Sequence, residues 1–210
     1  MRTEHEVVVL SAVRTAVGKY GGSLKDQPPT ELAALVVREA VRRAGIEPAT
    51  VGHVVFGNVI HTDIHDMYLA RVAAIKGGLP VETPALTLNR LCGSGLQAIV
   101  SAAQVIQLGD ADVAVAGGAE VMSRGQYWVP GLRWGQRMND GAVVDAMVGA
   151  LTDPFDDCHM GITASACAAN ASFSSMTSRS RTLSPARSRT LRTAETGPMP
   201  MYRGSTPANA

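Results

Sequence analysis

The chain has 210 residues, 46% of them hydrophobic, a formal net charge of +1 and three cysteines. Its length suits one good-sized domain or two small ones, and its near-zero charge gives no support to nucleic acid or an anionic surface as a partner of the whole chain. An odd number of cysteines at unpatterned spacing argues against a disulfide scaffold and favours a reduced, cytoplasmic protein.

The chain opens with alternating predicted strands and helices. Residues 7–11 form a continuous apolar, β-branched run, which predicts a strand buried on both faces. This run is too short for a signal peptide or a membrane span, so we expect no membrane partner. Thr30, as an N-cap behind two prolines, predicts a helix over residues 31–44 that ends at Gly45. Residues 51–60 predict a second buried strand.

The same alternation continues through the middle of the chain. Residues 66–76 predict a second helix, and residues 84–88 predict another buried strand. A central, buried helix is expected from Cys92 through Leu108, and residues 112–116 form a fourth apolar run. Strands that alternate with helices pair in parallel through right-handed crossovers, so we predict an α/β layered sheet.

Cys92 lies where a predicted strand passes into a helix. The free N–H groups and the positive end of the helix dipole favour an anion there, so a thiol becomes a thiolate more readily. Gly93 and Gly95 leave no side chains around the sulfur, which allows a substrate or another backbone segment to approach closely. The pattern predicts an activated nucleophile. The alternative is a buried structural cysteine that packs as a small hydrophobe.

Cys92 stands in the sequence NRLCGSGLQAI, which resembles the nucleophile segment of the thiolase family, the acyl-CoA C-acetyltransferases. Four further motifs follow the family's order: SAVRTAVGKYGGSLKD, GNVI, GGAEVMS and HMGITA. The resemblance covers about residues 6–164. It implies a thiolase-like layered fold, with an N-terminal βαβαβα half and the start of a lid or loop domain. It also implies transfer of acyl groups between CoA thioesters.

The resemblance assigns roles to single residues. Cys92 would attack the acyl-CoA thioester and carry the acyl group, and its own backbone N–H would help to stabilise the oxyanion. His159 and Met160 match the family's HMG motif, whose residues face the pantetheine arm and thioester end of CoA. Leu151 matches a position that lines the CoA site. Acyl-CoA is the implied substrate, with no permanently bound cofactor and no metal. The family forms dimers or tetramers, an expectation that we do not extend to a shortened chain.

Two other groups of residues have side chains that could bind a metal or form a catalytic pair. His61, Asp63 and His65 would lie on one face of an extended segment, a spacing that suits a metal. We do not predict a metal site, because no second cluster completes one and thiolase chemistry needs none. Cys158 is adjacent to His159, but neighbours in an extended chain point in opposite directions, so we expect no Cys–His pair.

The predicted organisation is an α/β half over residues 1–122, part of a lid over residues 123–164, and an out-of-family tail over residues 165–210. The tail is rich in Ser, Thr, Ala, Arg and Pro, has Glu195 as its single acidic residue and lacks apolar periodicity, which predicts disorder. A basic tail that binds nucleic acid is the less favoured interpretation, because no aromatic residues interleave for stacking. We favour a tail translated out of frame.

Three motifs of the thiolase family are missing from the sequence. In the family, the His of GHP deprotonates the cysteine, the Asn of NEAF orients an oxyanion-hole water, and the Cys of CxGGG moves the proton of the attacking acyl-CoA. Cys167 lies in the tail and does not fit the last role. Two functions follow: a thiolase-type acyltransferase with a cysteine acyl-enzyme, or a catalytically inactive thiolase fragment that lacks the C-terminal half. A ketoacyl synthase has a different sequence around its cysteine.

Overall fold

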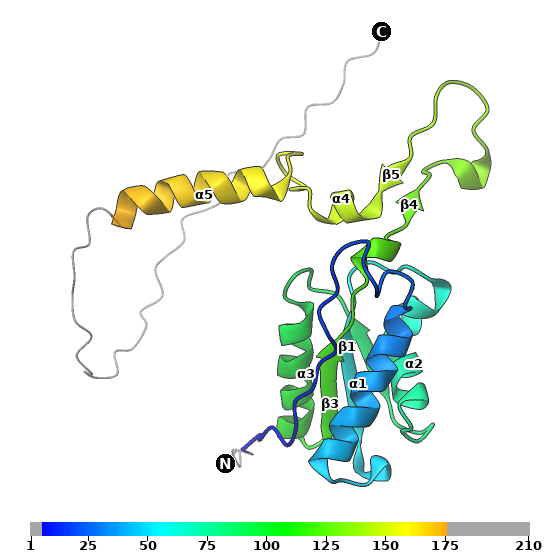
Figure 1. Cartoon of the computed structure of the whole chain (residues 1–210), viewed down its shortest axis with the longest axis vertical. Helices are drawn as coiled ribbons and strands as arrows, with labels where there is room; N and C mark the ends of the chain where they lie inside the picture. The colour runs from blue at the N-terminus through cyan, green and yellow to red at the C-terminus, as the bar shows by residue number, and fades with distance from the viewer. Residues whose placement is uncertain (1–5, 176–210) are drawn as a thin grey trace. The chain divides into compact units, whose positions relative to one another are not determined.

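The computed structural model describes residues 6–175, with side chains as far as residue 168 (Figure 1). The chain divides into two units, Met1–Ser165 and Ala166–Ala210. The first unit holds a three-stranded sheet and a small two-stranded sheet. The description below concerns this unit and the helix that crosses its end.

The larger sheet is parallel throughout. Its strands are β1 (His53–Gly57), β2 (Ala85–Leu88) and β3 (Ala114–Gly118), in the order β2-β1-β3. In the register, Val54 lies opposite Ala85 on one side and opposite Val115 on the other. The predicted parallel α/β sheet is therefore confirmed, with β1 at its centre.

Helices cover the two faces of this sheet (Figure 1). On one face, α1 (Pro29–Ala44) and α2 (Leu69–Lys76) pack on the side chains of Val54 and Phe56. On the other face, α3 (Ser94–Leu108) packs through its alanines on Val55. Successive side chains of a strand point to opposite faces, so the continuous run HVVF can bury both. The result is a three-layer α/β/α arrangement.

The ends of the first two helices differ slightly from the prediction. α1 begins at Pro29 rather than at residue 31, because proline lacks the N–H that the first turn leaves unused and its fixed φ suits a helix. Thr30 therefore lies buried inside the first turn instead of capping it. Gly45 ends α1 with φ of 67°, as predicted. A 3-10 helix, η2 (Ile64–Tyr68), precedes α2.

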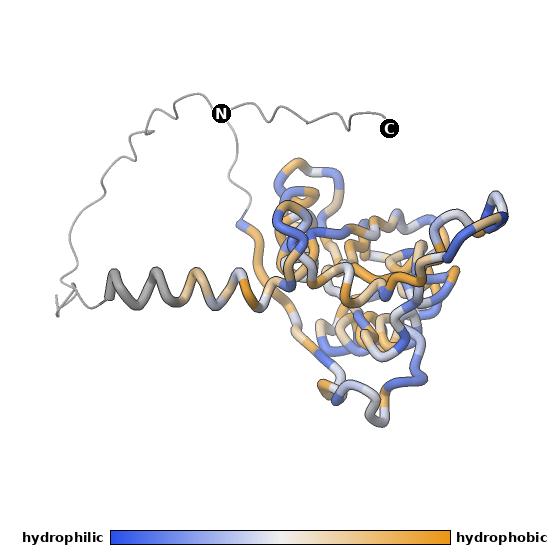
Figure 2. The backbone as a smooth tube through the Cα atoms, turned by 90° about the horizontal axis from the view of Figure 1, so that it is seen from above, coloured by the Kyte–Doolittle hydropathy of each residue, from blue (hydrophilic) through white to orange (hydrophobic). Residues whose placement is uncertain are grey.

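The predicted strand over residues 7–11 is absent. This segment is extended but pairs with no strand, and its side chains are largely exposed, Val9 to 80%. The Ser11 hydroxyl connects this segment to α1 by donating a hydrogen bond to the Ala40 carbonyl at 2.7 Å. Figure 2 shows the segment as an apolar stretch. The prediction of burial is wrong because a strand needs a neighbouring backbone, and none of the described residues supplies one.

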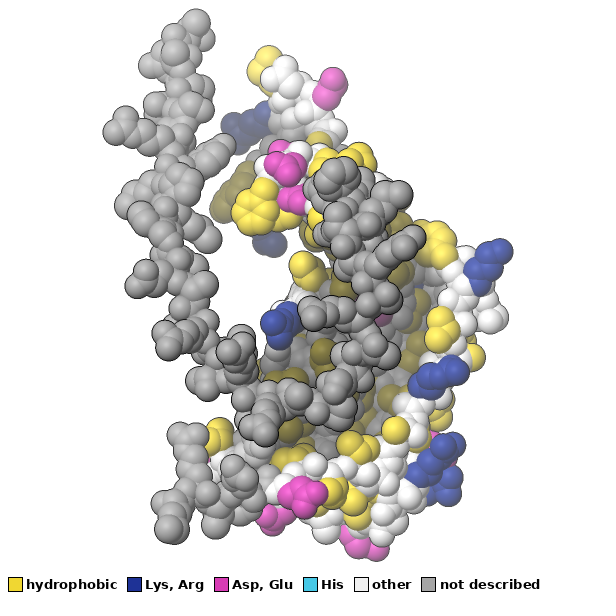
Figure 3. Space-filling view, turned by 90° about the vertical axis from the view of Figure 1, so that its left-hand side faces the viewer, with side chains coloured by type: hydrophobic (Ala, Val, Ile, Leu, Met, Phe, Trp, Pro, Cys, Tyr) yellow, Lys and Arg dark blue, Asp and Glu magenta, His cyan; other side chains and the backbone are white. Residues whose placement is uncertain are grey.

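Helix α3 is less buried than predicted. Of its residues, Ser94, Ala98 and Ala102 are buried against the sheet, whereas Leu96 is 70% exposed. Figure 3, seen from the side of α3, shows hydrophobic side chains at the surface. By length and composition alone, Leu91–Leu108 could cross a membrane, a test that core helices also pass. Among the described residues, the sheet covers one face of α3, and no helix or strand covers the opposite face.

After β3 the chain forms short elements. A hairpin pairs Tyr127 with Asp145 and Trp128 with Val144. Disorder predicted from Ser165 is wrong for residues 165–175, which are helical; residues 176–210 lie outside the described part. The remaining elements are η1 (Pro48–Thr50), η3 (Met122–Arg124), β4 (Tyr127–Trp128), η4 (Leu132–Trp134), β5 (Val144–Asp145), α4 (Ala146–Ala150) and α5 (Met160–Ser175).

Candidate active site

A tight turn between β2 and α3 carries Cys92. Leu91, just before the cysteine, has φ of 47°, in the left-handed region that side chains other than glycine rarely adopt. The Asn89 side chain holds this conformation by accepting the Leu91 N–H at 2.8 Å. Backbone strain of this kind persists only where surrounding contacts enforce it, and it gathers at functional sites. The turn is therefore a built feature that fixes the position of Cys92.

Ser94 anchors this turn to the sheet. Its buried hydroxyl accepts the Arg90 N–H at 2.8 Å and donates to the Leu91 carbonyl at 2.7 Å. Gly57, at the end of β1, lies directly beneath it, since a Cβ on Gly57 would come within 2.7 Å of the Ser94 Cβ. Only glycine allows β1 and the start of α3 to approach so closely.

Cys92 is exposed and its thiol is free. It lies two residues before the first residue of α3, in an exposed turn, so the helix that was predicted to begin at Cys92 begins at Ser94 instead. Exposure argues against the alternative of a buried structural cysteine. In the described part of the chain, no hydrogen bond or ion pair reaches the Cys92 sulfur. The geometry thus presents an exposed thiol, and none of the described side chains contacts it as a base.

Glu120 links β1, β3 and the nucleophile turn. Its carboxylate accepts the Val59 N–H at 2.8 Å and the Ile60 N–H at 3.2 Å, and it also accepts the Asn58 amide at 3.1 Å. The Val59 carbonyl in turn accepts the Asn89 side chain at 3.4 Å. These hydrogen bonds connect Glu120, through the loop after β1, to Asn89, the residue that holds Leu91 in its left-handed conformation.

Sequence reasoning missed Glu120 and Asn58 as supports of the site. Both stand in motifs that carried the family resemblance, GGAEVMS and GNVI. Their mutual hydrogen bond depends on β1 and β3 being adjacent, which the order of elements alone does not establish. The two motifs were the signal that could have revealed these supports. In each of them a polar residue, Asn58 or Glu120, lies near the end of a predicted buried strand.

Partial burial raises the pKa of the Glu120 carboxyl, although the Val59 and Ile60 N–H groups pull it down. A raised carboxyl pKa means that the folded state binds the proton more readily than the unfolded state. The stability from this group is fully present below the ordinary pKa of 4.5 and is lost as pH rises through the raised value.

We therefore expect that Glu120→Gln removes the loss of stability that Glu120 causes as pH rises, because glutamine does not titrate. Urea unfolding of the chain and the variant, measured between about pH 4 and about pH 7, checks the prediction. Glu82→Gln is the matched control, since no described hydrogen bond or ion pair involves that exposed side chain. Parallel pH profiles for the chain and Glu120→Gln would contradict the expectation.

The structure brings together the residues that resemblance assigned to CoA. The Met160 N–H donates to the Leu151 carbonyl at 2.8 Å, and Thr152 and His159 form an isolated β-bridge. His159 Nδ1 accepts the Gly161 N–H at 3.0 Å. Leu151, the C-cap of α4, is thus held beside His159 and Met160 in the turn that starts α5. Among the described residues, no hydrogen bond or ion pair joins this turn to Cys92, so the CoA-binding roles stay predictions.

Cys158 and His159 have different partners. The Cys158 sulfur lies 3.7 Å from the Thr163 hydroxyl, whereas the His159 ring faces the Gly161 N–H. No described hydrogen bond joins the sulfur to the imidazole, as the opposite directions of adjacent side chains predict. The two residues therefore do not form a nucleophile–base pair.

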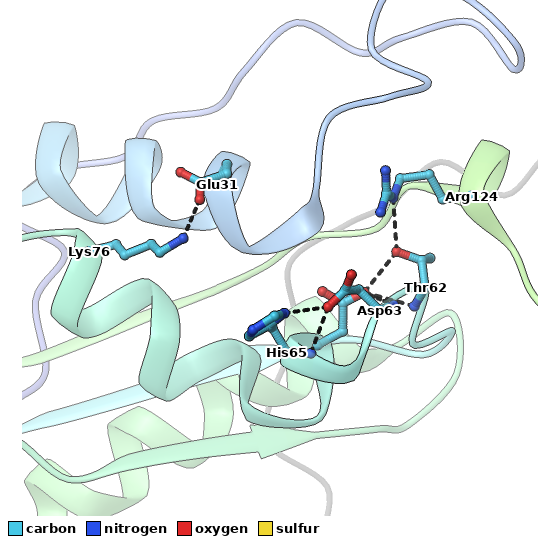
Figure 4. Close-up of polar contacts among 7 residues, drawn as sticks. Glu31, Thr62, Asp63, His65, Lys76 and Arg124 are labelled. Carbon is cyan, nitrogen blue, oxygen red and sulfur yellow. Dashed lines mark hydrogen bonds and ion pairs between the residues drawn. The ribbon is translucent and has the colours of Figure 1, made fainter.

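Asp63 is the N-cap of the 3-10 helix η2, and His65 lies inside that helix (Figure 4). The Asp63 carboxylate caps η2 and contacts the His65 ring, and the His65 N–H and ring lower the pKa of that carboxyl. The prediction of an extended segment is wrong from Ile64 onward, because the cap starts a 3-10 helix there. Arg124 reaches the Thr62 hydroxyl at 3.3 Å. Within residues 6–168, whose side chains the structure describes, no group of three or more ligand-type side chains is placed to hold a metal.

The fold and the site define an α/β protein that presents an exposed, free cysteine next to the start of a helix. The sequence model of the family described as "Thiolase, N-terminal domain" matches residues 7–179. The chain therefore belongs to the thiolase family. This match passes residue 164, where we expected the resemblance to end, and it includes all of α5.

Relatives and solved structures agree with this assignment. The β-ketothiolase BktB of Cupriavidus necator is 66% identical over 159 residues, which are 76% of this chain and 40% of that protein. The acetyl-CoA acetyltransferase of the same organism is 50% identical over 160 residues, again 76% and 40% of the two chains. The chain thus spans about 40% of the length of these relatives.

Two solved structures match the fold. The acetyl-CoA acetyltransferase of Bacillus anthracis gives a TM-score of 0.78 at 41% identity, over 82% of this chain and 43% of that one. Human mitochondrial 3-ketoacyl-CoA thiolase in complex with CoA gives a TM-score of 0.75 at 39% identity, over 78% and 42%. Both comparisons confirm the predicted thiolase-like fold.

Proposed function

We propose that this chain supplies the acyl-accepting half of a thiolase-type transfer between CoA thioesters. The observation that carries the proposal is the exposed, free thiol of Cys92 on a strained turn at the start of α3. The Cys92 sulfur attacks the thioester carbonyl and forms a new carbon–sulfur bond. The bond to the CoA sulfur breaks, and CoA leaves as its thiol with the proton that the cysteine loses.

Groups around the turn support this step. The described hydrogen bonds leave the Cys92 N–H unused, so it is free to donate to the oxyanion of the tetrahedral intermediate. Gly95 faces open space, which leaves room for the thioester. Leu151, His159 and Met160 are the residues to which we assign the pantetheine arm. The setting that we infer is cytoplasmic acyl-CoA chemistry of fatty-acid metabolism.

Release of CoA tests the acylation step. With acetyl-CoA in excess, we expect a slow burst of free CoA that approaches one equivalent per chain. The rate should rise with pH, because the thiolate is the attacking species. A thiol reagent on the protein-free filtrate measures the release. Cys92→Ala should lose the burst, whereas Cys158→Ala, the matched control, should keep it.

The second candidate is a catalytically inactive thiolase fragment. The absence of GHP, NEAF and CxGGG from the sequence favours it, since those motifs carry the base, the oxyanion water and the second cysteine in the family. CoA release no greater from the chain than from Cys92→Ala would select this candidate. Release that depends on Cys92 would reject it for the acylation step.

A further inference from the structure

Glu120 is a carboxylate whose described hydrogen bonds all come from the loop after β1. Its Oε2 accepts the Val59 N–H at 2.8 Å, and its Oε1 accepts the Ile60 N–H at 3.2 Å and the Asn58 side-chain amide at 3.1 Å. Among the described residues, no salt bridge involves Glu120. A carboxylate accepts at both oxygens, whereas the amide of glutamine accepts at one end and donates at the other. Glutamine here would direct an N–H group at one of these donors, so the loop requires a carboxylate.

The loop that Glu120 holds is bonded on its other side to the end of β2 and the turn that follows. The Asn58 N–H donates to the Leu88 carbonyl at 3.1 Å, and the Asn89 side chain donates to the Val59 carbonyl at 3.4 Å. Val59 thus gives its N–H to Glu120 and offers its carbonyl to Asn89. A shift of this loop therefore moves Asn89 with it.

The Asn89 side chain also holds the unfavourable backbone conformation of Leu91. Its Oδ1 accepts the Leu91 N–H at 2.8 Å, and Leu91 has φ of 47°. The left-handed region is costly for leucine, so this residue stays there only while its contacts enforce it. Cys92 is the next residue. The backbone of Leu91 therefore determines where the N–H and the thiol of Cys92 lie.

We propose that Glu120 is a positioning residue for Cys92, which acts through the loop after β1 and Asn89 to keep Leu91 left-handed. No described hydrogen bond or ion pair joins Glu120 to Cys92. The inference rests on the proposed acylation of Cys92, since it states which residue outside the turn makes that step fast. Displacement of an attacking group by about 1 Å can cost about 100-fold in rate. Loss of the Glu120 carboxylate therefore slows acylation, although no group that touches the thioester is removed.

Glu120→Gln and the exposed control Glu82→Gln test the proposal by two measurements. Amide exchange, followed by NMR, reports on the Leu91 N–H, and the burst of CoA release reports on acylation. In Glu120→Gln we expect exchange at Leu91 to be about tenfold faster and CoA release to be about tenfold slower. Glu82→Gln should change neither. Asn89→Ala removes the exposed side chain that connects the loop to Leu91, and it should have the same two effects as Glu120→Gln.

A glycine at position 91 distinguishes positioning from a general loss of structure. Glycine adopts positive φ without a steric cost, so its backbone depends less on support from neighbours. Beside Leu91→Gly, Glu120→Gln should slow CoA release by less than about threefold. Beside Leu91→Ala, the loss of about tenfold should remain, because alanine shares the steric cost that leucine has in this region.

The outcomes separate the positioning role from the proposed function. Unchanged exchange at Leu91 in Glu120→Gln overturns the proposal, and so does a loss of CoA release that is as large beside Leu91→Gly as beside Leu91→Ala. If the unchanged chain releases no CoA, the proposed function fails, and exchange at Leu91 alone decides the positioning role. If circular dichroism shows that Glu120→Gln does not fold, Glu120→Asp replaces it, because its shorter side chain keeps the charge but does not reach the same donors.

Discussion

The 210-residue chain is expected to show no measurable steady-state cleavage of acetoacetyl-CoA, even though Cys92 is exposed and free. Turnover requires a base for the nucleophile and a second group that moves the proton of the other acyl-CoA. No described contact provides a base to the Cys92 sulfur, and the sequence lacks all three motifs that supply these groups in the family. Each lost proton transfer costs roughly 10²–10⁴ in rate, so two cost roughly 10⁴–10⁸.

The assay needs an active reference and a nucleophile control. The full-length β-ketothiolase of C. necator, measured under the same conditions, sets the scale. Cys92→Ala sets the background. Steady-state cleavage by the chain that disappears in Cys92→Ala would contradict the prediction. It would mean that other residues of this chain replace the missing groups.

The second large effect is expected at Gly57. A Cβ on Gly57 would lie 2.7 Å from the Ser94 Cβ and 2.8 Å from the Ser94 carbonyl carbon. Backbone cannot yield as the end of a flexible side chain can, so Gly57→Ala forces β1 and α3 apart. Overpacking of this kind costs about 1–3 kcal/mol. Displacement of Ser94 also releases the turn that holds Leu91 and Cys92.

Gly95→Ala is the matched control for Gly57→Ala. Gly95 lies in the first turn of α3, and a Cβ there would meet nothing within 4 Å. Alanine favours a helix over glycine by up to about 1 kcal/mol, so this variant should be as stable as the chain or slightly more so. Urea unfolding measures both changes. Equal stability of Gly57→Ala and the unchanged chain would show that the close approach of β1 and α3 is not required.

The sequence predicted the layered core well because its signals are local. β-branched runs separated by amphipathic segments favour parallel strands and covering helices, provided that each strand has a neighbour. Gly45 ended α1 as predicted, because only its own left-handed backbone matters there. The start of α3 beside Cys92 followed equally from the Gly-Ser-Gly sequence. These elements position Cys92, the proposed nucleophile, so much of the candidate site was also predictable.

The failures concern properties that depend on neighbours. Residues 7–11 have a strand sequence, but pairing needs an adjacent backbone that the described residues do not provide. Leu96 is apolar enough for a core, yet its burial requires a layer on the outer side of α3. The support of the turn by Glu120 required knowledge that β3 lies beside β1. The β4–β5 hairpin is too short for periodicity to reveal it.

The central claim is that Cys92 is the residue that takes the acyl group. Its most direct test is a peptide map by mass spectrometry after incubation with acetyl-CoA and an acid quench that preserves thioesters. The three free cysteines serve as internal competitors, since Cys92 and Cys167 are both exposed and Cys158 is half-buried. We predict one acetyl group, on the peptide that contains Cys92. An acetyl group found chiefly on Cys158 or Cys167, or on none of the three, would contradict the claim.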